Sequence, residues 1–444
     1  HSPGRPGKNV SGSIGSRKRC KMKKRIVCFG PGPKFKGGIS NYNTSLAKAF
    51  DAAGHDVFIV SWTQQYPAII PREFVDKSSK NDLLEGTNVQ VSYHTNYNNP
   101  FTWSKTCQFI ESLKPDLVIF QWSIAIQGLP IGWMARKLSR NANIEVIFDL
   151  HFVIQKEASG LDRNFTKYGI SPAKTYIAHA YKTVDELKEL FPKQALLVNE
   201  TGVRSTDPAQ KTVIKLFHPV YDLFKEDPQF DKEAFKKANG LREHVFLFFG
   251  FIRKYKGLHQ VIPAFAELAK RRDDVSLIIC GESFWKTLDN TKWSTRIKNT
   301  LFKLAKSIFL NSKEDESQYN PLEMIDKLGI RDKVMVYNEY VPNEKVHQYF
   351  QASDAILLFY EYATPSGVES LSYNFKLPIL AASVGHFPET VVDGFNGYLA
   401  KEADIADMTR VMEHFIEHPI PGSNVEETTR HMSWVKYAEK VVGI

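Results

Sequence analysis

The segment VFLFFGFIRKYKG, residues 245–257, sets the architecture that we expect for this chain. Its first five residues are apolar without alternation, which is typical of a parallel strand buried on both faces. Gly250 ends the strand, three basic residues follow, and an amphipathic pattern over Leu258–Ala269 predicts a helix. The segment therefore indicates a strand–turn–helix unit with cations in its turn.

The same unit recurs in both directions along the chain. Further strands are predicted at VSLIICG, VMVYN, AILLFY and LPILAAS downstream, and at Arg25–Phe29, Val57–Ser61, Val89–Tyr93, Leu117–Phe120, Val146–Phe148 and Tyr176–Ala178 upstream. Helices are expected between them, for example over Ser40–Ala53 and Asn343–Gln351. This alternation predicts an α/β protein with two Rossmann-like domains, each a doubly wound parallel sheet. Because ligands of open α/β sheets bind beyond the carboxyl ends of the strands, we expect a central cleft between the domains to hold the ligand site.

The chain of 444 residues is long enough for two hydrophobic cores. We expect an N-terminal domain over 22–215, a C-terminal domain over 216–420, and a linker at about 213–240. Residues 421–444 are expected to form a C-terminal helix that packs back on the N-terminal domain.

Residues 1–21 lack periodicity and are rich in Gly, Ser, Pro and Lys, so we interpret them as an added or disordered leader, with Met22 as the native start. They carry six basic residues and no acid, which leaves +3 of the net charge of +9 for residues 22–444. The charge therefore does not indicate a nucleic-acid partner.

Composition favours a globular protein of the cytoplasm. Hydrophobic residues make up 43% and charged residues 24% of the chain, and no apolar run reaches the roughly 18–20 residues that a membrane span needs. The four cysteines form no CxxC pair, and Cys28 and Cys280 lie inside apolar runs. Unpaired thiols of this kind favour a reducing compartment.

The glycine-rich turn after the first predicted strand excludes two nucleotide-binding motifs. A dinucleotide fingerprint needs glycine where Phe35 stands, and a P-loop needs Lys-Ser/Thr where Gly38 and Ile39 stand. A glycine turn that enters a helix remains, and it can present backbone N–H groups to an anion.

Two later segments carry the groups that a nucleotide-diphosphate sugar requires. A leaving diphosphate gains negative charge in the transition state, and Arg253 and Lys256 supply cations for it. Beyond the strand at AILLFY, Glu361 can accept hydrogen bonds from sugar hydroxyls. The turn at 366–368 (Ser366, Gly367 and Val368) can offer N–H groups at a helix start, and Glu369 follows it. No DxD-type acid pair stands in a credible metal-binding position, since Asp273 and Asp274 are better interpreted as a solvated turn.

Seven collinear segments resemble family 4 of the glycosyltransferases, a retaining family with the GT-B fold. They are GGISNY (37–42), FDLHFV (148–153), LFHPVYDLF (216–224), FFGFIRKYKG (248–257), IICGE (278–282), YVPNEKVHQYFQASDAILLFYEYATPSGVES (340–370) and GHFPETVVDGFNGYL (385–399). The IRxYKG and SGV sequences are similar to those of one subgroup of this family.

The resemblance implies a role for individual residues. Arg253 and Lys256 match the basic pair on the donor diphosphate, and Gly38 matches the glycine whose backbone approaches the phosphates. His151 matches a histidine that faces the reacting sugar. Glu361 resembles the acid near the transferred sugar.

The sequence departs from the family pattern at two places. Phe251 replaces the usual arginine after the strand glycine, so Arg253 would act in its place. Glu369 resembles the acid near the ribose, but it stands two residues too far from Pro378, and alignment from that proline places Leu371 there instead. Both alignments stay open at this point.

The resemblance implies a retaining glycosyltransferase that uses a nucleotide-diphosphate sugar, with UDP or GDP expected, and needs neither cofactor nor metal. The expected acceptor is a glycan or a lipid-linked sugar in cell-envelope polysaccharide synthesis. The alternatives are a GT-B sugar-nucleotide epimerase or phosphorylase, and a non-catalytic GT-B module that binds a nucleotide or a partner. Neither the base, the sugar, the acceptor nor the oligomeric state can be predicted.

Several segments are candidates for acceptor or membrane contact. Acceptor binding is expected at Tyr93–Trp103, at QWSIAIQGLPIGW (121–133) and at Gln155–Tyr168, and the base-binding loop near Tyr340 and Val341. The basic amphipathic pattern at 293–310 allows peripheral contact with the inner face of a membrane, although helices of this kind more often cover their own domain.

Overall fold

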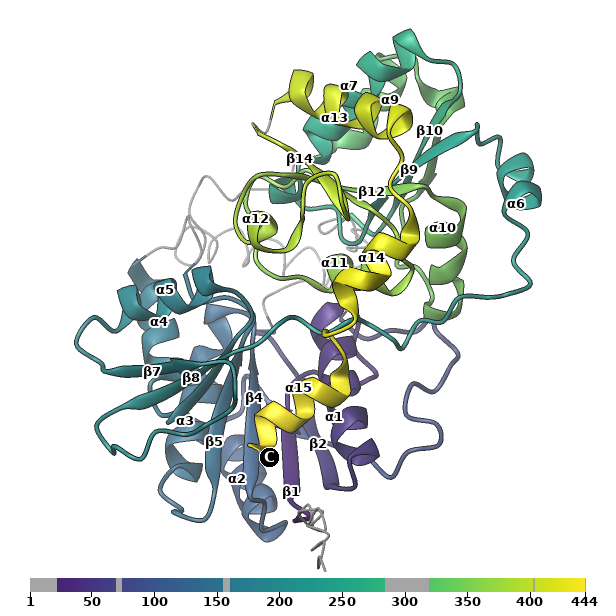
Figure 1. Ribbon diagram of the computed structural model, residues 1–444. Coiled ribbons are helices and arrows are strands. Elements are labelled where there is room, and N and C mark those ends of the chain that lie inside the picture. Colours follow the sequence, from purple (N-terminus) through teal and green to yellow (C-terminus); the bar gives the residue numbers. More distant parts are fainter. Residues whose placement is uncertain (1–21, 69–73, 155–159, 284–318, 402–403, 444) are drawn as a thin grey trace, which may run out of the picture.

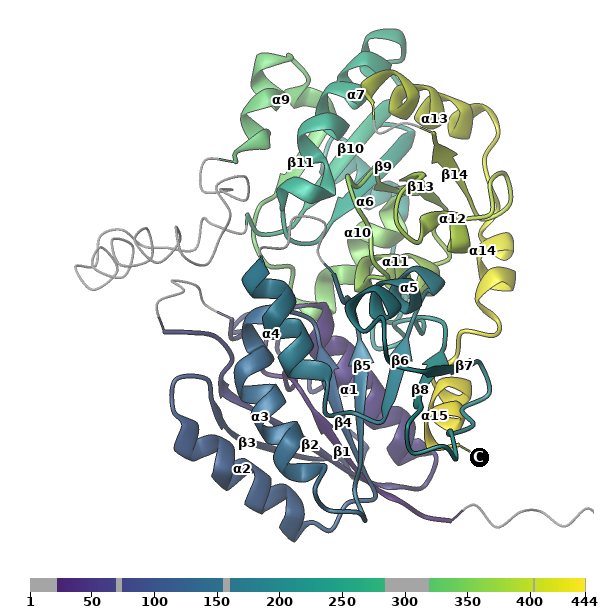
Figure 2. The same cartoon turned by 90° about the vertical axis from the view of Figure 1, so that its left-hand side faces the viewer.

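The structure is a computed structural model that describes residues 22–68, 74–154, 160–283, 319–401 and 404–443. Two α/β domains are stacked one upon the other (Figures 1 and 2). The strands are β1 (Arg25–Phe29), β2 (Asp56–Gln64), β3 (Gln90–Asn96), β4 (Leu117–Trp122), β5 (Glu145–Leu150), β6 (Thr175–Ala178), β7 (Leu196–Asn199), β8 (Lys211–Lys215), β9 (His244–Phe249), β10 (Val275–Cys280), β11 (Val334–Tyr337), β12 (Ala355–Leu358), β13 (Ile379–Ala382) and β14 (Gly397–Ala400). The α-helices are α1 (Gly38–Ala52), α2 (Pro100–Ser112), α3 (Gly128–Leu138), α4 (Gly160–Ile170), α5 (Tyr181–Leu190), α6 (Lys232–Ala238), α7 (Leu258–Arg271), α9 (Met324–Lys327), α10 (Val346–Ala352), α11 (Gly367–Asn374), α12 (Phe387–Thr390), α13 (Ile405–Glu417), α14 (Gly422–Thr429) and α15 (Trp434–Val442).

Both sheets are parallel and doubly wound, which confirms the predicted fold class. The N-terminal sheet has the order β3-β2-β1-β4-β5-β6-β8-β7, and the C-terminal sheet has the order β11-β10-β9-β12-β13-β14. The strand order therefore reverses beside β1 in one sheet and beside β9 in the other. Ligands bind at such reversal points, so the loops after β1, β9 and β12 are placed to form the site.

The central strands form because they are apolar on both faces. All six residues of β4 and all six of β10 are buried. Helices cover the sheets through amphipathic faces, as in α7, where eight residues from Leu258 to Ala269 are buried. Strands β7, β8 and β14 were not predicted, because β7 is only half-buried, β8 has a lysine at each end, and β14 is a four-residue strand that begins with glycine. The expected linker at about 213–240 therefore begins only after Lys215, where β8 ends, and it contains α6.

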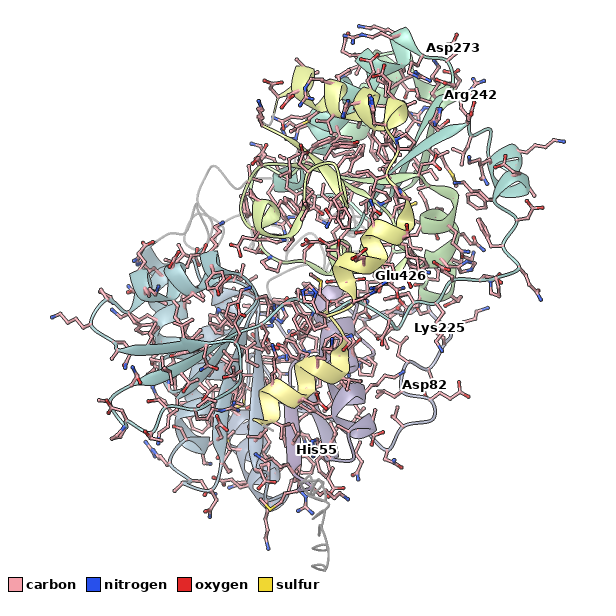
Figure 3. The ribbon with its side chains drawn as sticks, in the orientation of Figure 1. His55, Asp82, Lys225, Arg242, Asp273 and Glu426 are labelled. Atoms are coloured by element: carbon pink, nitrogen blue, oxygen red, sulfur yellow. The ribbon has the colours of Figure 1, made fainter. Side chains whose placement is uncertain are left out.

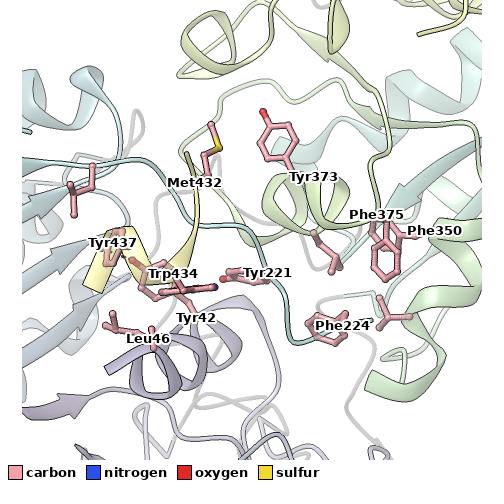
Figure 4. Packing of buried hydrophobic residues seen from close by; sticks show 14 of the residues in the cluster. Tyr42, Leu46, Tyr221, Phe224, Phe350, Tyr373, Phe375, Met432, Trp434 and Tyr437 are labelled. Atoms are coloured by element: carbon pink, nitrogen blue, oxygen red, sulfur yellow. Dashed lines mark hydrogen bonds between the residues drawn. The ribbon is translucent and has the colours of Figure 1, made fainter. Parts of the chain in front are cut away.

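The last helix, α15, lies against α1 of the N-terminal domain (Figure 1). Its Trp434 ring lies 5.1 Å from the ring of Tyr42, centroid to centroid, at 66°. Figure 4 shows Trp434 and Tyr437 beside Tyr42 and Tyr221, with the apolar cluster continuing toward Phe350 and Phe375 of the C-terminal domain. One buried cluster thus runs from the first domain into the second beneath the cleft.

Asp273, predicted to lie in a solvated turn, is found at the periphery of the molecule. Asp273 is fully exposed, pairs with Lys333 at 2.9 Å, and lies at the end of the C-terminal domain remote from the cleft (Figure 3). Cys28, Cys107 and Cys280 are buried and unpaired. Among the described residues, no helix is long and apolar enough to cross a bilayer. The leader at 1–21, the helix expected at 293–310 and part of the Gln155–Tyr168 segment lie outside the described residues.

Candidate active site

A cavity of about 240 Å³ lies between the two domains, at the carboxyl ends of β1, β9 and β12. The N-terminal domain contributes Gly37, Gly38 and Asn41 to its lining, and the C-terminal domain contributes most of the rest. The other lining residues are Tyr221, Phe224, Phe249, Gly250, Phe251, Tyr255, Lys256, Gly281, Glu282, Tyr340, Val341, Asn343, Val346, Ser366, Gly367, Val368 and Leu371.

Two helix N-termini meet at this cavity from opposite domains. Helix α1 begins at Gly38, after Gly37 with a φ of 107°, and α11 begins at Gly367. A Cβ atom on Gly38 would lie 3.9 Å from the Cα atom of Gly367, so the two backbones approach closely. The first N–H groups and the positive dipole ends of both helices therefore face the same space, which favours an anion there.

Lys256 is the buried cation of the cavity. It lies in the turn between β9 and α7, with 7% of its surface exposed, and it lines the cavity. Gly250 has a φ of 95°, which favours glycine at that position, and a Cβ atom there would lie 2.8 Å from the Nζ atom of Lys256. Burial, with a smaller effect of the nearby charge of Arg253, lowers the pKa of Lys256 to about 7. A diphosphate would supply the anionic partner that favours the charged form.

Arg253 and Glu361 lie beside the cavity but do not line it. Arg253 precedes the turn of Lys256, and its guanidinium lies 5.9 Å from the ring of Tyr255, which does line it. The backbone N–H of Glu361 donates to the carbonyl of Tyr255 at 2.7 Å. The Glu361 carboxylate lies 3.2 Å from Nε2 of His259, and Nδ1 of His259 lies 3.0 Å from the hydroxyl of Tyr319.

Of the two residues that the alignments place at the second acid, Leu371 faces the cavity and Glu369 does not. Leu371 lines the cavity, whereas Glu369 is 3% exposed and does not line it. The Glu369 carboxylate is turned toward α12, where it is hydrogen-bonded to His386, to Thr390 at 2.6 Å and to Tyr373 at 3.0 Å. Burial acts to raise its pKa, but the charge and hydrogen bonds of these partners hold the pKa below the usual value.

On the N-terminal side, His151 follows β5 and is buried with a defined partner. Its Nε2 atom lies 2.7 Å from Oε1 of Gln121, and its ring stands edge-on to that of Tyr42 with centroids 4.6 Å apart. Burial lowers the pKa of His151 to about 3, so the imidazole is neutral at neutral pH. It can therefore act as a hydrogen-bonding group but not as a cation.

A buried carboxylate supports this side of the cleft. Asp149 lies 2.8 Å from Nε2 of His179, and it accepts a hydrogen bond from the hydroxyl of Tyr437 at 3.1 Å. Burial acts to raise the pKa of Asp149, but the interaction with His179 holds it below the usual value. Tyr42 donates to Tyr437 at 2.6 Å, which connects α1, β5 and α15.

His218, in the connection between the domains, extends this network into the C-terminal domain. Its Nδ1 atom lies 2.5 Å from the hydroxyl of Ser370 on α11. Burial lowers its pKa well below the usual value, with nearby histidines adding to the effect. The hydroxyl of Tyr221, three residues on, donates to the carbonyl of Gly38 at 2.7 Å. The chain that connects the domains therefore contacts both α1 and α11 and fixes the positions of their N-termini relative to each other.

Polar contacts close the rest of the interface between the domains. Lys36 lies 3.3 Å from Glu282, with 13% and 11% of these side chains exposed. The Glu389 carboxylate accepts from the backbone N–H groups of Tyr181 and Lys182 at the start of α5, at 3.1 and 3.3 Å. The two domains are thus joined at both flanks of the cleft.

The structure brings together five of the residues singled out in the sequence: Gly38, Lys256, Ser366, Gly367 and Val368 all line one cavity. It places Arg253, Glu361, Glu369 and His151 outside that lining. Tyr340 and Val341, expected to hold the base, line it as well. Asn41, Tyr221 and Glu282 were missed as individual residues, although each lies in a segment that resembles the family.

Two family models match different halves of the chain. The model described as Glycosyltransferase Family 4 matches residues 36–204, and the model described as Glycosyl transferases group 1 matches residues 229–440. D-inositol 3-phosphate glycosyltransferase of Streptomyces avermitilis is 33% identical over 94 residues, which is 21% of this chain and only 20% of that protein.

Solved structures share the fold along nearly the whole chain. Anabaena HepE in complex with UDP-glucose matches with a TM-score of 0.63 at 15% identity, over 94% of this chain and 98% of that one. Sucrose-phosphate synthase from Thermosynechococcus elongatus matches with a TM-score of 0.62 at 13% identity, over 95% and 98%. WaaG, described as a glycosyltransferase involved in lipopolysaccharide biosynthesis, matches with a TM-score of 0.55 at 14% identity, over 95% and 100%. These likenesses identify the two-sheet architecture as the GT-B fold.

Proposed function

The chain belongs to glycosyltransferase family 4, a retaining family. We propose that it transfers the hexose of a UDP-hexose to a glycan or a lipid-linked acceptor in the synthesis of a cell-envelope polysaccharide. The proposal of UDP and of an envelope acceptor follows the solved relatives described as bound to UDP-glucose and as acting in lipopolysaccharide biosynthesis.

One observation carries the proposal: the cavity holds a buried lysine beneath two opposed helix N-termini. A buried ammonium without an anion is unfavourable, and a diphosphate between the helix starts would satisfy both. We assign Lys256, Gly38 and the N–H groups at 366–368 to the diphosphate, with Arg253 at its outer edge.

The remaining roles concern the transferred sugar. Glu361 accepts hydrogen bonds from its hydroxyls, and neutral His151 faces it from the N-terminal domain. The leaving phosphate oxygen takes the proton of the acceptor hydroxyl on the same face of the sugar, so the anomeric configuration is kept. Without a metal, stabilisation of the leaving charge falls to the lysine and the helix termini.

The test is a donor panel assayed by release of nucleoside diphosphate, with and without EDTA. UDP-glucose, UDP-galactose, UDP-N-acetylglucosamine and GDP-mannose are each supplied with lipid and glycan acceptor extracts. We expect one UDP-sugar to turn over equally with EDTA, and Glu361→Gln to lose turnover while it still binds UDP.

Three other outcomes contradict the proposal. Binding of UDP without any turnover would favour a non-catalytic module. Conversion of the donor sugar with no acceptor consumed would favour an epimerase. Loss of activity with EDTA, restored by a divalent ion, would contradict the metal-independent mechanism.

A further inference from the structure

The wall of the cavity next to the start of α11 is apolar at the position where a ligand would pass the helix. Gly367 and Leu371 are four residues apart and therefore lie on the same face of α11, one turn from each other. Both line the cavity. In the proposed binding mode, the diphosphate binds the helix start and the next group, the pentose, extends along this face toward Leu371.

No carboxylate from α11 is available to that pentose. Glu369 lies on another face of the helix, where it is held by His386, Thr390 and Tyr373. Rotating it into the cavity would leave the buried His386 and Tyr373, and the part-buried Thr390, without their acceptor, which is costly. The helix is therefore fixed with its leucine, and not its acid, against the cavity.

The other carboxylate at the cavity is already engaged. Among the described residues that line it, Glu282 is the one acid, and it is paired with Lys36 across the domain boundary. Among the other lining residues, Val368, Phe224 and Val346 carry no hydrogen-bonding side-chain groups, and the polar residues Asn41, Tyr221 and Asn343 are not acids. A pentose hydroxyl placed here gains no charged acceptor.

We propose that the site does not discriminate between pentoses because Leu371 stands at the cavity wall in place of an acid. It accepts 2′-deoxyribonucleoside diphosphates as readily as ribonucleoside diphosphates. The proposal rests on the nucleotide-sugar function proposed above. An apolar wall discriminates weakly for or against one hydroxyl, whereas a site that hydrogen-bonds the hydroxyl rejects the analogue that lacks it. Leu371 is thus a specificity residue and takes no part in bond breaking.

The test is calorimetric titration of the full chain with UDP, 2′-deoxy-UDP and 2′,3′-dideoxy-UDP, repeated with the guanine series if UDP does not bind. We expect the Kd values of the ribo and deoxy forms to agree within roughly fivefold, because no charged acceptor faces the hydroxyls. A larger preference for the ribo form would overturn the proposal. Absence of binding by every nucleoside diphosphate would instead contradict the proposed function itself.

Variants at the same position provide the second arm. Leu371→Glu restores an acid to the cavity face, and we expect it to prefer UDP over 2′-deoxy-UDP by about tenfold or more, the effect of a hydrogen bond to a charged group. Leu371→Met, a volume-matched control, should show the wild-type ratio. If Leu371→Glu unfolds, Leu371→Gln offers a neutral acceptor for the same comparison. An unchanged ratio in the folded acidic or amide variant would overturn the assignment.

Discussion

The two walls of the cleft differ in how their charges are satisfied. The N-terminal wall is defined here by Tyr42, Asp149, His151 and His179. Its buried carboxylate has its partners, and His151 is neutral. On the C-terminal wall, defined by Lys256, the turn at 366–368 and Leu371, a buried lysine faces an apolar cavity.

The difference separates two tasks. A wall whose buried carboxylate already has its partners can orient a sugar without prior rearrangement. A wall with a desolvated lysine beside the start of α11 gains most of its favourable electrostatic energy only when an anion binds. Disruption of the first wall should therefore reduce stability, whereas disruption of the second should reduce binding and catalysis.

The largest effect is expected on the C-terminal wall, from Lys256→Ala. Loss of one preorganised donor at a developing charge lowers kcat/KM by about 10²–10³-fold. Lys254→Ala, two residues away in the same turn but exposed, is the matched control and should retain activity. Steady-state kinetics compares the two. Equal kinetics for Lys256→Ala and the control would place the diphosphate elsewhere.

On the N-terminal wall, Asp149→Ala should cost about 3 kcal/mol of unfolding free energy, since it leaves His179 and Tyr437 buried without their acceptor. Glu145→Ala on the same strand removes a part-exposed pair with Arg204, and it should cost no more than about 1 kcal/mol. Urea unfolding measures both. A smaller loss for Asp149→Ala than for Glu145→Ala would mean that the buried network does not stabilise this wall.

Lowering the pH should reduce the free energy of unfolding through the buried histidines beside the cleft. The pKa of buried His151 is lowered to about 3 and that of His218 is also lowered, so the unfolded chain binds more protons than the folded one below about pH 6.5. The stability is present above that pH and falls by about 1.4 kcal/mol per pH unit for each histidine as pH decreases. Thermal unfolding between pH 7.5 and 5 should show a falling Tm, with a shallower slope in His151→Asn. A Tm that rises toward pH 5 would contradict neutral burial.

The smallest effect concerns His259, which we propose positions Glu361 at the edge of the C-terminal wall. His259→Ala should lower kcat/KM by about fivefold, the order expected for one part-exposed contact, and His259→Gln should recover part of the loss. Because His259 acts through Glu361, the double variant with Glu361→Gln should be no slower than Glu361→Gln alone. Additive losses would show that His259 acts independently.

How far the sequence predicts this cleft depends on the range of the contacts. The strand–turn–helix units and the residues at their turns, such as Lys256 and Gly367, follow from local pattern, so both sheets and part of the cavity could be predicted. Strands β7 and β14 could not, because short or half-exposed strands lack a continuous apolar run.

The direction of each side chain at the site was less accessible than its position. The spacing to Pro378 left Glu369 and Leu371 as alternatives, and only the partners of Glu369 on α12 decide which one faces the cavity. Likewise, Asp149, His179 and Tyr437 are far apart in the sequence, and no local pattern reveals that they share one network.

The most direct test of the difference between the walls is the proton balance of nucleotide binding. With a pKa of about 7, Lys256 is mostly neutral at pH 8 and should take up roughly one proton per UDP bound. Titration calorimetry of UDP at pH 8, in two buffers of different ionisation enthalpy, measures this uptake in the wild type and in Lys256→Ala. We predict uptake near one proton in the wild type, with weaker binding and no uptake in the variant. UDP binding of equal strength in both proteins, with no proton exchanged, would contradict it.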